Sequence, residues 1–180
     1  MDFRDVCQKY FGYLLEDGYE ILVEKNENCM EYKKGNLIIQ LFFEKQGYEI
    51  YICVTHIDGR VVRAYDILAY FDMDSQRGGY QIPRLGDLEK GICYLSKTLC
   101  CILKLVDVSD EANFQKLYDF STNKQSDEAK LLNIQRELRK AEKCWKEHDY
   151  KQAEYLLQKH IKYLSLSQKM KLQYIQKHNR

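Results

Sequence analysis

The chain has 180 residues, of which 45% are hydrophobic and 13% aromatic, and its formal net charge is +1. This composition is typical of a globular protein and lies outside the range of disordered chains. No apolar run reaches the roughly 18 residues of a membrane span, and the first residues lack the basic start and apolar stretch of a signal peptide, so we expect a cytoplasmic protein.

The small net charge hides an asymmetry between two parts of the sequence. Residues 1–123 contain 14 basic and 20 acidic side chains, whereas residues 124–180 contain 14 basic and 7 acidic ones. Residues 155–180 carry six bases and no acid. The C-terminal part is therefore a candidate for binding nucleic acid, or for packing against the acidic part of the same chain.

The seven cysteines do not follow a metal-binding spacing. They stand at positions 7, 29, 53, 93, 100, 101 and 144, and none forms a Cys-x-x-Cys pair. Structural zinc sites need such close pairs, because one turn of the chain must present two thiolates to one ion. We expect these cysteines to be small buried side chains in a reducing compartment, and we predict no metal and no cofactor.

The first 58 residues are predicted to form one helix and several strands. Apolar residues recur at spacings of three and four from Phe3 to Leu15, which predicts a helix that ends at Asp17-Gly18. The four strand candidates are residues 19–25, 29–33, 37–45 and 48–58. Short connections that contain glycine predict an antiparallel meander for the last three, and the apolar residues on both faces of 48–58 predict a central strand.

The next segment mixes a short strand, helices and the longest predicted loop. Val61-Val62 could form a fifth strand, and Asp66 could cap a short helix. Residues 72–86 contain the only proline and are expected to form a loop, and a long helix follows over 87–105. Another helix is expected to start at Ser109-Asp110-Glu111, and the polar segment 121–126 is a candidate hinge.

The rest of the chain is predicted to be helical. Helices are expected over 127–147 and 151–164, and Ser165 with Gln168 could cap a third helix, unless the second continues without a break. We therefore predict an α+β fold with an antiparallel sheet of three to five strands, flanking helices and a C-terminal helical hairpin. The predicted domains are residues 1–123 and 124–180, with the second packed on the first.

Ala141 and Ala153 stand twelve positions apart on two predicted helices, with Asp149-Tyr150 at the turn between them and Leu157 on the second helix. With this pattern, residues 134–158 resemble a single tetratricopeptide-type helical hairpin, in which small residues on two helices face each other and a large apolar residue stands where Leu157 does. The terminal proline of the repeat is absent. Because such repeats stack to bury their faces, one copy implies either a packed hairpin or a peptide-binding groove.

Residues 1–70 contain a helix that ends in FGYLLEDGY (11–19), the segments NLIIQL (36–41) and GYEIYI (47–52), and the helix start AYDIL (64–68). In this order of elements they resemble small bacterial α+β proteins that include immunity proteins of polymorphic toxin systems. It implies a protein that occludes the surface of a partner and carries no catalytic residues. Immunity proteins against nucleases tend to be strongly acidic, and this chain as a whole is not.

Sequence signals for catalysis are weak. Cys53 and His56 stand three apart on one predicted strand, so they point to opposite faces and do not form a nucleophile–base pair. Asp66, Asp72 and Asp74 could hold a hard cation, but acids at such turns commonly cap helices. The sequence contains no phosphate loop, serine-hydrolase motif or dinucleotide fingerprint. An enzyme with a site near 66–80 stays the weaker alternative.

The sequence therefore favours a non-catalytic cytoplasmic protein that binds another protein, most plausibly a bacterial toxin-immunity protein. A nucleic-acid-binding accessory protein that uses the basic C-terminal helices is the alternative. Interfaces favour tyrosine and arginine, and exposed lysines among tyrosines are typical of nucleic-acid contacts. The candidate partner-binding residues are Tyr48, Tyr51, Arg77, Tyr80, Lys159, Lys162, Tyr163 and Lys171.

Overall fold

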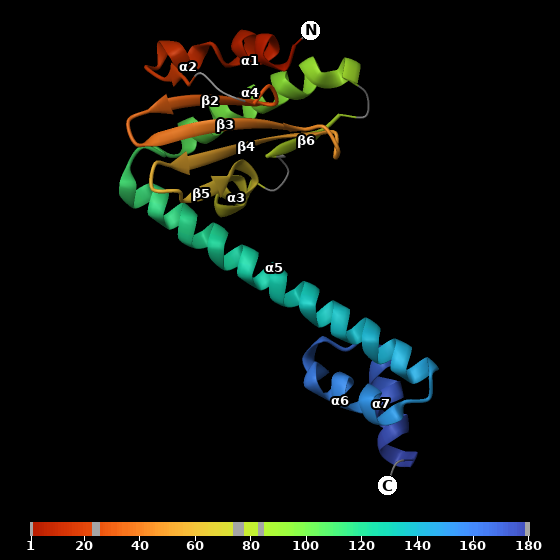
Figure 1. Ribbon diagram of the computed structural model, residues 1–180. Coiled ribbons are helices and arrows are strands. Elements are labelled where there is room, and N and C mark those ends of the chain that lie inside the picture. The colour runs from red at the N-terminus through yellow and green to blue at the C-terminus, as the bar shows by residue number, and fades with distance from the viewer. Residues whose placement is uncertain (1, 23–25, 74–77, 83–84, 179–180) are drawn as a thin grey trace. The chain divides into compact units, whose positions relative to one another are not determined.

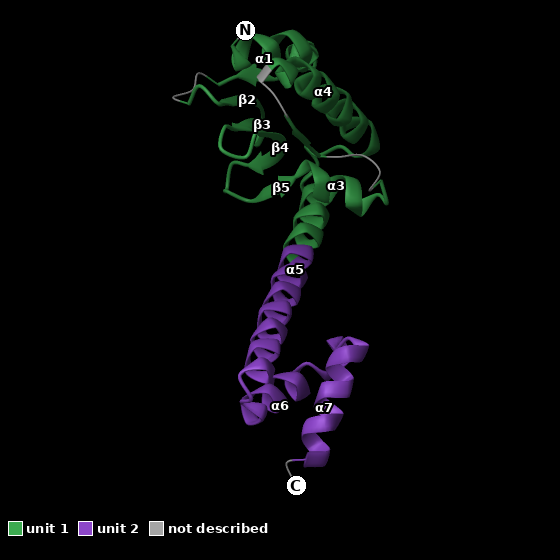
Figure 2. Ribbon diagram, turned by 90° about the vertical axis from the view of Figure 1, so that its right-hand side faces the viewer, with its two compact units in different colours: residues 1–122 green, residues 123–180 purple. Residues whose placement is uncertain are grey.

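The computed structural model describes residues 2–22, 26–73, 78–82 and 85–178 and has the predicted α+β fold (Figure 1). Its elements are α1 (Phe3–Phe11), α2 (Tyr13–Glu16), β1 (Glu20–Ile21), β2 (Cys29–Lys34), β3 (Leu37–Glu44), β4 (Glu49–His56), β5 (Val61–Arg63), α3 (Ala64–Tyr70), β6 (Gly79–Gln81), η1 (Leu85–Asp87), α4 (Leu88–Leu105), α5 (Glu111–Lys146), α6 (Tyr150–Lys159), η2 (Ile161–Tyr163) and α7 (Leu166–His178). The chain divides into two compact units, residues 1–122 and 123–180, here called unit 1 and unit 2 (Figure 2).

The sheet of unit 1 is antiparallel and centred on β4. Its strand order is β1-β2-β3-β4-β5, and β6 also pairs with β4. One edge of β4 pairs with β3 over its whole length, and the other pairs with β6 at Glu49–Tyr51 and with β5 at Cys53–Thr55. The predicted meander and the central position of this strand are confirmed. The sheet has one strand more than the largest number expected.

One face of the sheet forms the core of unit 1. Side chains alternate between the two faces of a strand, and β3 accordingly buries Ile39 and Leu41 while β4 buries Ile50 and Ile52. Apolar residues of α1, α2 and α4 belong to the same cluster. Figure 2 shows α1 and α4 on one side of the sheet. The other face, with Phe42 and Tyr51, is called the open face below.

The predicted loop over 72–86 contains a short strand. Residues 79–81 form β6, and Gly79 pairs with Tyr51. A Cβ atom at Gly79 would lie 2.9 Å from Oε1 of Glu49 and 3.3 Å from the carbonyl oxygen of Ile50. A strand of three residues is too short to show an alternating pattern, so the sequence predicts a loop here. The glycine at position 79 instead permits a close approach of two backbones.

Asp66 does not cap the short helix after β5. The helix begins at Ala64, with Arg63 in extended conformation at its N-cap position. Asp66 lies inside α3, is buried, and accepts a hydrogen bond of 2.7 Å from the hydroxyl of Ser121. The predicted N-cap lies three residues too late in the chain, because the Asp66 carboxylate makes an interior contact with α5 instead of capping the helix.

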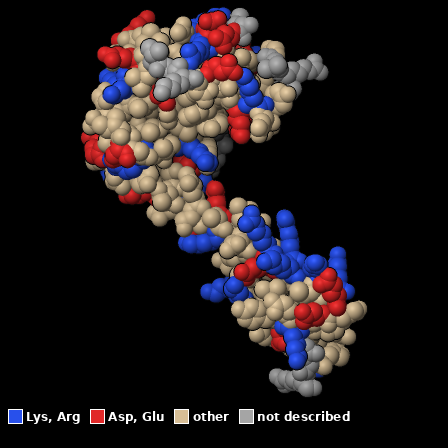
Figure 3. Space-filling view, viewed as in Figure 1, with Lys and Arg blue, Asp and Glu red and all other residues tan. Residues whose placement is uncertain are grey.

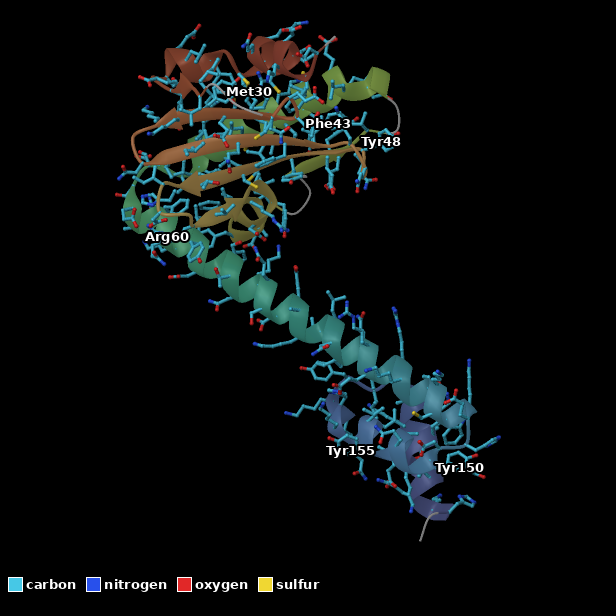
Figure 4. The ribbon with its side chains drawn as sticks, viewed as in Figure 1. Met30, Phe43, Tyr48, Arg60, Tyr150 and Tyr155 are labelled. Carbon is cyan, nitrogen blue, oxygen red and sulfur yellow. The ribbon has the colours of Figure 1, made fainter. Side chains whose placement is uncertain are left out.

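The β4–β5 hairpin is linked to the first turns of α5 by Arg60 (Figure 4). Its guanidinium lies 2.8 Å from Oδ2 of Asp58 and 2.6 Å from Oε1 of Glu111, donates to Gln115, and stacks 5.3 Å from the ring of Phe114. The hydrogen bond from Arg60 holds the pKa of Asp58 well below its usual range. These contacts fix the start of α5 on unit 1.

Residues 121–126, the candidate hinge, are helical, and the boundary between unit 1 and unit 2 falls within them. Helix α5 runs without a break from Glu111 to Lys146 and so passes through this segment. The segment is polar but contains neither glycine nor proline, and its residue types lower helix stability only slightly. Ser121 is buried and donates its hydroxyl to Asp66, so this polar residue makes an interior contact of the helix and does not indicate a loop.

Unit 2 has its own small apolar core. Its buried residues come from α5, α6 and α7, and include the facing pair Ala141 and Ala153 together with Leu157. The predicted third helix is separate: Ser165 and Gln168 form a reciprocal capping box, with bonds of 3.0 and 3.3 Å between backbone amides and side chains. The second helix ends at Lys159 instead of continuing to residue 164.

No helix in the described part of the chain combines the length and the apolar character that crossing a membrane requires.

Candidate functional site: a groove on the open sheet face

The open face of the sheet carries a groove of about 460 Å³. It is lined by Gln40, Phe42, Glu44, Glu49, Tyr51, Ile52, Cys53, Val61, Arg63, Tyr65, Gly78 and Gly79. These residues come from β3, β4, β5, β6 and the start of α3, so strands that neighbour one another in the sheet supply most of the lining. We call it the sheet groove.

The floor of the sheet groove is aromatic. Phe42 and Tyr51 are directly opposite each other on β3 and β4, and their rings stack with centroids 5.3 Å apart and an angle of 24° between planes. Both are half-buried, and Cys53 beside them is only 5% exposed. Burial raises the pKa of Tyr51 and also raises that of the Cys53 thiol to about 11. The floor therefore offers uncharged, apolar contact area.

A chain of polar side chains runs across the same face. The hydroxyl of Thr55 donates to Oε1 of Gln40 at 2.6 Å, and the amide nitrogen of Gln40 donates to Glu31. Because both polar ends of its amide are used, Gln40 is held in one orientation. This fixes one wall of the sheet groove next to Phe42.

Charges of opposite sign lie at different parts of the groove lining. Arg63 on β5 donates to the hydroxyl of Tyr65 at 3.0 Å and lies 5.7 Å from its ring centroid, and this hydrogen bond raises the pKa of Arg63. Glu44 and Glu49 are paired across β3 and β4 at the ends of those strands. The aromatic floor therefore has a cation on the β5 side and two carboxylates at the end of the β3–β4 hairpin.

Of the tyrosines predicted to be anchors, Tyr51 lines the sheet groove and two others lie elsewhere. Tyr48 is 51% exposed in the β3–β4 turn, where its φ of 50° is left-handed (Figure 4). Tyr80 packs against Tyr94 of α4 with ring centroids 5.6 Å apart, and a Cβ atom on Gly91 would lie 2.8 Å from its ring. Tyr80 is thus a packing residue between β6 and α4. Arg77 lies outside the described residues.

The predicted residues of unit 2 fall into two groups. Lys159 pairs with Glu137 at 2.8 Å, and Lys171 pairs with Glu142, so both contact α5. Lys162 and Tyr163 lie in η2 and are exposed, with 54% of Tyr163 accessible. These four residues belong to unit 2, whereas Tyr51 belongs to unit 1.

Sequence reasoning missed most of the groove lining. Phe42 lies in a predicted strand and Tyr65 in a predicted helix start, whereas Arg63 belongs to neither. Of these, Phe42 could have been found together with Tyr51. The predicted meander, combined with the alternation of side chains, places both on the face opposite Ile50 and Ile52. Arg63 and Tyr65 gave no comparable signal, because their position depends on where α3 begins.

The described residues do not assemble the catalytic sites considered from the sequence. Cys53 lines the open face, whereas His56 stacks on Phe114 at 5.6 Å, as expected for residues three apart on a strand. Asp66 is buried, Asp72 is exposed, and Asp74 lies outside the described residues. Within the described ranges, no three His, Cys, Asp or Glu side chains are placed to hold a metal ion.

Comparison of the chain with family models, with curated proteins and with solved structures finds no match in any of the three. The resemblances to a tetratricopeptide hairpin and to bacterial immunity proteins stay predictions. A function is therefore inferred from the residues of this chain alone.

Proposed function

We propose that this chain is a non-catalytic binding module that holds a partner protein on the open face of its sheet. The observation that carries the proposal is the sheet groove, where a stacked pair, Phe42 and Tyr51, lies among side chains of opposite charge. Its volume of about 460 Å³ is sufficient for one large side chain with its neighbours. Aromatic residues and arginine dominate the energetics of protein interfaces.

The chemistry of the groove defines the segment that it would accept. An aromatic or long aliphatic side chain of the partner would pack on Phe42 and Tyr51. A basic residue beside it would face Glu44 and Glu49, and an acidic residue would face Arg63. Such complementary charges fix the orientation of a partner and speed its association more than they add affinity.

The reactivity of the groove favours binding over covalent catalysis. Because the thiolate is the nucleophilic form of cysteine, a pKa of about 11 keeps Cys53 protonated and unreactive at neutral pH. The seven cysteines are all free thiols, which supports a reducing compartment such as the cytoplasm.

A toxin-immunity role is the more specific form of the proposal. Occlusion of a toxin requires a preformed surface, and a sheet face held by strand pairing on both edges of β4 meets this need. The support for this form is the resemblance of residues 1–70 together with the groove.

The proposal is tested by affinity capture from lysate of the source organism with four variants of the full chain. Tyr51→Ala removes half of the stacked floor, and Arg63→Glu reverses the cation. The matched controls are Tyr155→Ala, at a tyrosine that is 60% exposed in unit 2 (Figure 4), and Lys33→Glu on the open face outside the groove. We expect both groove variants to reduce recovery of a specific partner by at least about tenfold, as for truncation of an interface anchor.

Recovery of the partner that is equal for the wild-type chain and both groove variants would contradict the proposal. If the captured protein is a toxin, we expect the wild-type chain to inhibit it and the Arg63→Glu variant to fail. If the wild-type chain captures a toxin but does not inhibit it, the result supports the binding module and contradicts the immunity role.

A further inference from the structure

The C-terminal part of α5, in unit 2, presents a row of basic side chains that the proposed function does not use. Arg136, Arg139, Lys140, Lys143 and Lys146 are all exposed. Their spacings of three and four place them along one side of the helix. The residues that pack in the core of unit 2, Ile134, Leu138, Ala141 and Trp145, follow the same spacing on the opposite side. We call these five basic residues the α5 basic face (Figure 3).

The acids of α5 leave this face positive because two of them are turned toward α6 and α7. Glu137 contacts Lys159 at 2.8 Å and His160 at 2.6 Å, and these hydrogen bonds lower the pKa of Glu137. Glu142 pairs with Lys171. Of the three lysines predicted as contacts, Lys159 and Lys171 are thus paired with acids of α5, whereas Lys162 is exposed.

The basic face keeps nearly all of its own charge. Lys143 lies 3.7 Å from Glu147, and both side chains are more than half exposed, so this pair is weak. Within the described ranges, Arg136, Arg139 and Lys140 form no ion pair with an acidic side chain. At a rise of about 1.5 Å per residue, the row from residue 136 to 146 is roughly 15 Å long.

We propose that the α5 basic face binds the phosphate backbone of duplex nucleic acid. A row of arginine and lysine along one helix is typical of proteins that bind a phosphate backbone, and arginine can bind phosphate through two parallel hydrogen bonds. Trp145, the aromatic residue of α5 nearest to this row, packs against the core of unit 2 on the opposite side of the helix, so it is not placed beside the row to stack on unpaired bases. The contact is therefore with the backbone, independent of sequence, and steeply dependent on salt.

The experiment measures fluorescence anisotropy of labelled DNA and RNA duplexes of about 20 base pairs with the full chain, between about 50 and 200 mM salt. The test variant, Arg136→Gln/Arg139→Gln/Lys140→Gln, removes three charges from the basic face. The control variant, Lys162→Gln/Lys169→Gln/Lys177→Gln, removes three exposed charges from η2 and α7. Glutamine favours the helix nearly as well as arginine and lysine do, and circular dichroism checks that both variants are folded.

We expect the wild-type chain to bind at least one of the two duplexes. The duplex that it binds more tightly shows whether the phosphates are those of DNA or of RNA. The slope of log K against log salt should become shallower by about 2.7 in the test variant, since each lost phosphate contact removes about 0.9. The control variant should keep the wild-type slope.

Three outcomes would overturn the proposal. The first is no binding of either duplex at the lowest salt. The second is an equal loss in both variants, which would place the affinity in the net charge of unit 2 or in its C-terminal helices. The third is binding to vesicles that contain phosphatidylserine, lost in the test variant, together with no binding to either duplex. This result would make a membrane surface the partner.

Discussion

At the scale of one residue, Tyr32 places a hydroxyl in the apolar core of unit 1. It is fully buried on β2, and among the described residues its hydroxyl has no hydrogen-bond partner. Burial of an unpaired polar group costs free energy, so we expect Tyr32→Phe to leave stability unchanged or raise it by about 1 kcal/mol in urea unfolding. Tyr13→Phe is the matched control, because that hydroxyl donates to the Ser96 carbonyl, and we expect it to lose about 1 kcal/mol. A loss for Tyr32→Phe as large as for the control would show that the Tyr32 hydroxyl is paired.

Cys53 gives a pH dependence at the same scale. Burial raises its pKa from 9.0 to about 11, so above pH 9 the unfolded chain releases a proton that the folded chain retains. Stability is therefore expected to fall as the pH rises from 9 toward 11. In urea unfolding at about pH 7 and pH 10.5, the Cys53→Ala variant should lose less stability with pH than the wild-type chain, by on the order of 2 kcal/mol. Identical losses in the two proteins would contradict the burial of this thiol.

At the scale of elements, Arg60 links a hairpin to a helix. It contacts Asp58, Glu111, Gln115 and Phe114, and its side chain is 19% exposed. We expect Arg60→Ala to lower the free energy of unfolding of unit 1 by about 1–3 kcal/mol, because several hydrogen bonds to charged groups are lost together. Lys45→Ala serves as the control, since its pair with Glu27 is exposed on both sides and should contribute less than about 1 kcal/mol. Equal effects of the two substitutions would show that the contacts of Arg60 are no stronger than an ordinary surface pair.

The elements also show what the sequence could and could not predict. Apolar periodicity located β3, β4 and α4 well, because each pattern extends over eight residues or more. The predicted cap at Asp66 and the predicted break between helices at residues 121–126 share one physical cause. Asp66 and Ser121 are polar residues that satisfy each other in the interior, and a local pattern cannot distinguish such a pair from a cap and a loop.

At the scale of the whole molecule, the two units have hydrophobic clusters that share no residue. We therefore expect two transitions in calorimetric unfolding of the full chain. Leu157→Ala should lower the midpoint of one transition and leave the other unchanged, because Leu157 is buried only in the cluster of unit 2. A single transition that shifts as a whole would show that the two units unfold cooperatively.

The candidate site is also a property of the whole sheet rather than of a motif. Tyr51 was predicted as an anchor from residue type alone, and the groove around it depends on the register that places Phe42 opposite it and Arg63 opposite Cys53. Register follows from strand pairing, and the predicted meander gives the pairing of β3 with β4. It could not be derived for β5, whose three residues give too short a pattern.

Occupation of the sheet groove by a partner protein can be measured by photo-crosslinking in cells of the source organism, with a benzophenone amino acid at position 51 or, as the control, at position 33 on the same face. We expect a discrete crosslinked protein from position 51 that is absent from position 33 and lost when Arg63→Glu is introduced. A crosslink pattern that is the same from both positions, or unchanged by Arg63→Glu, would contradict occupation of the groove.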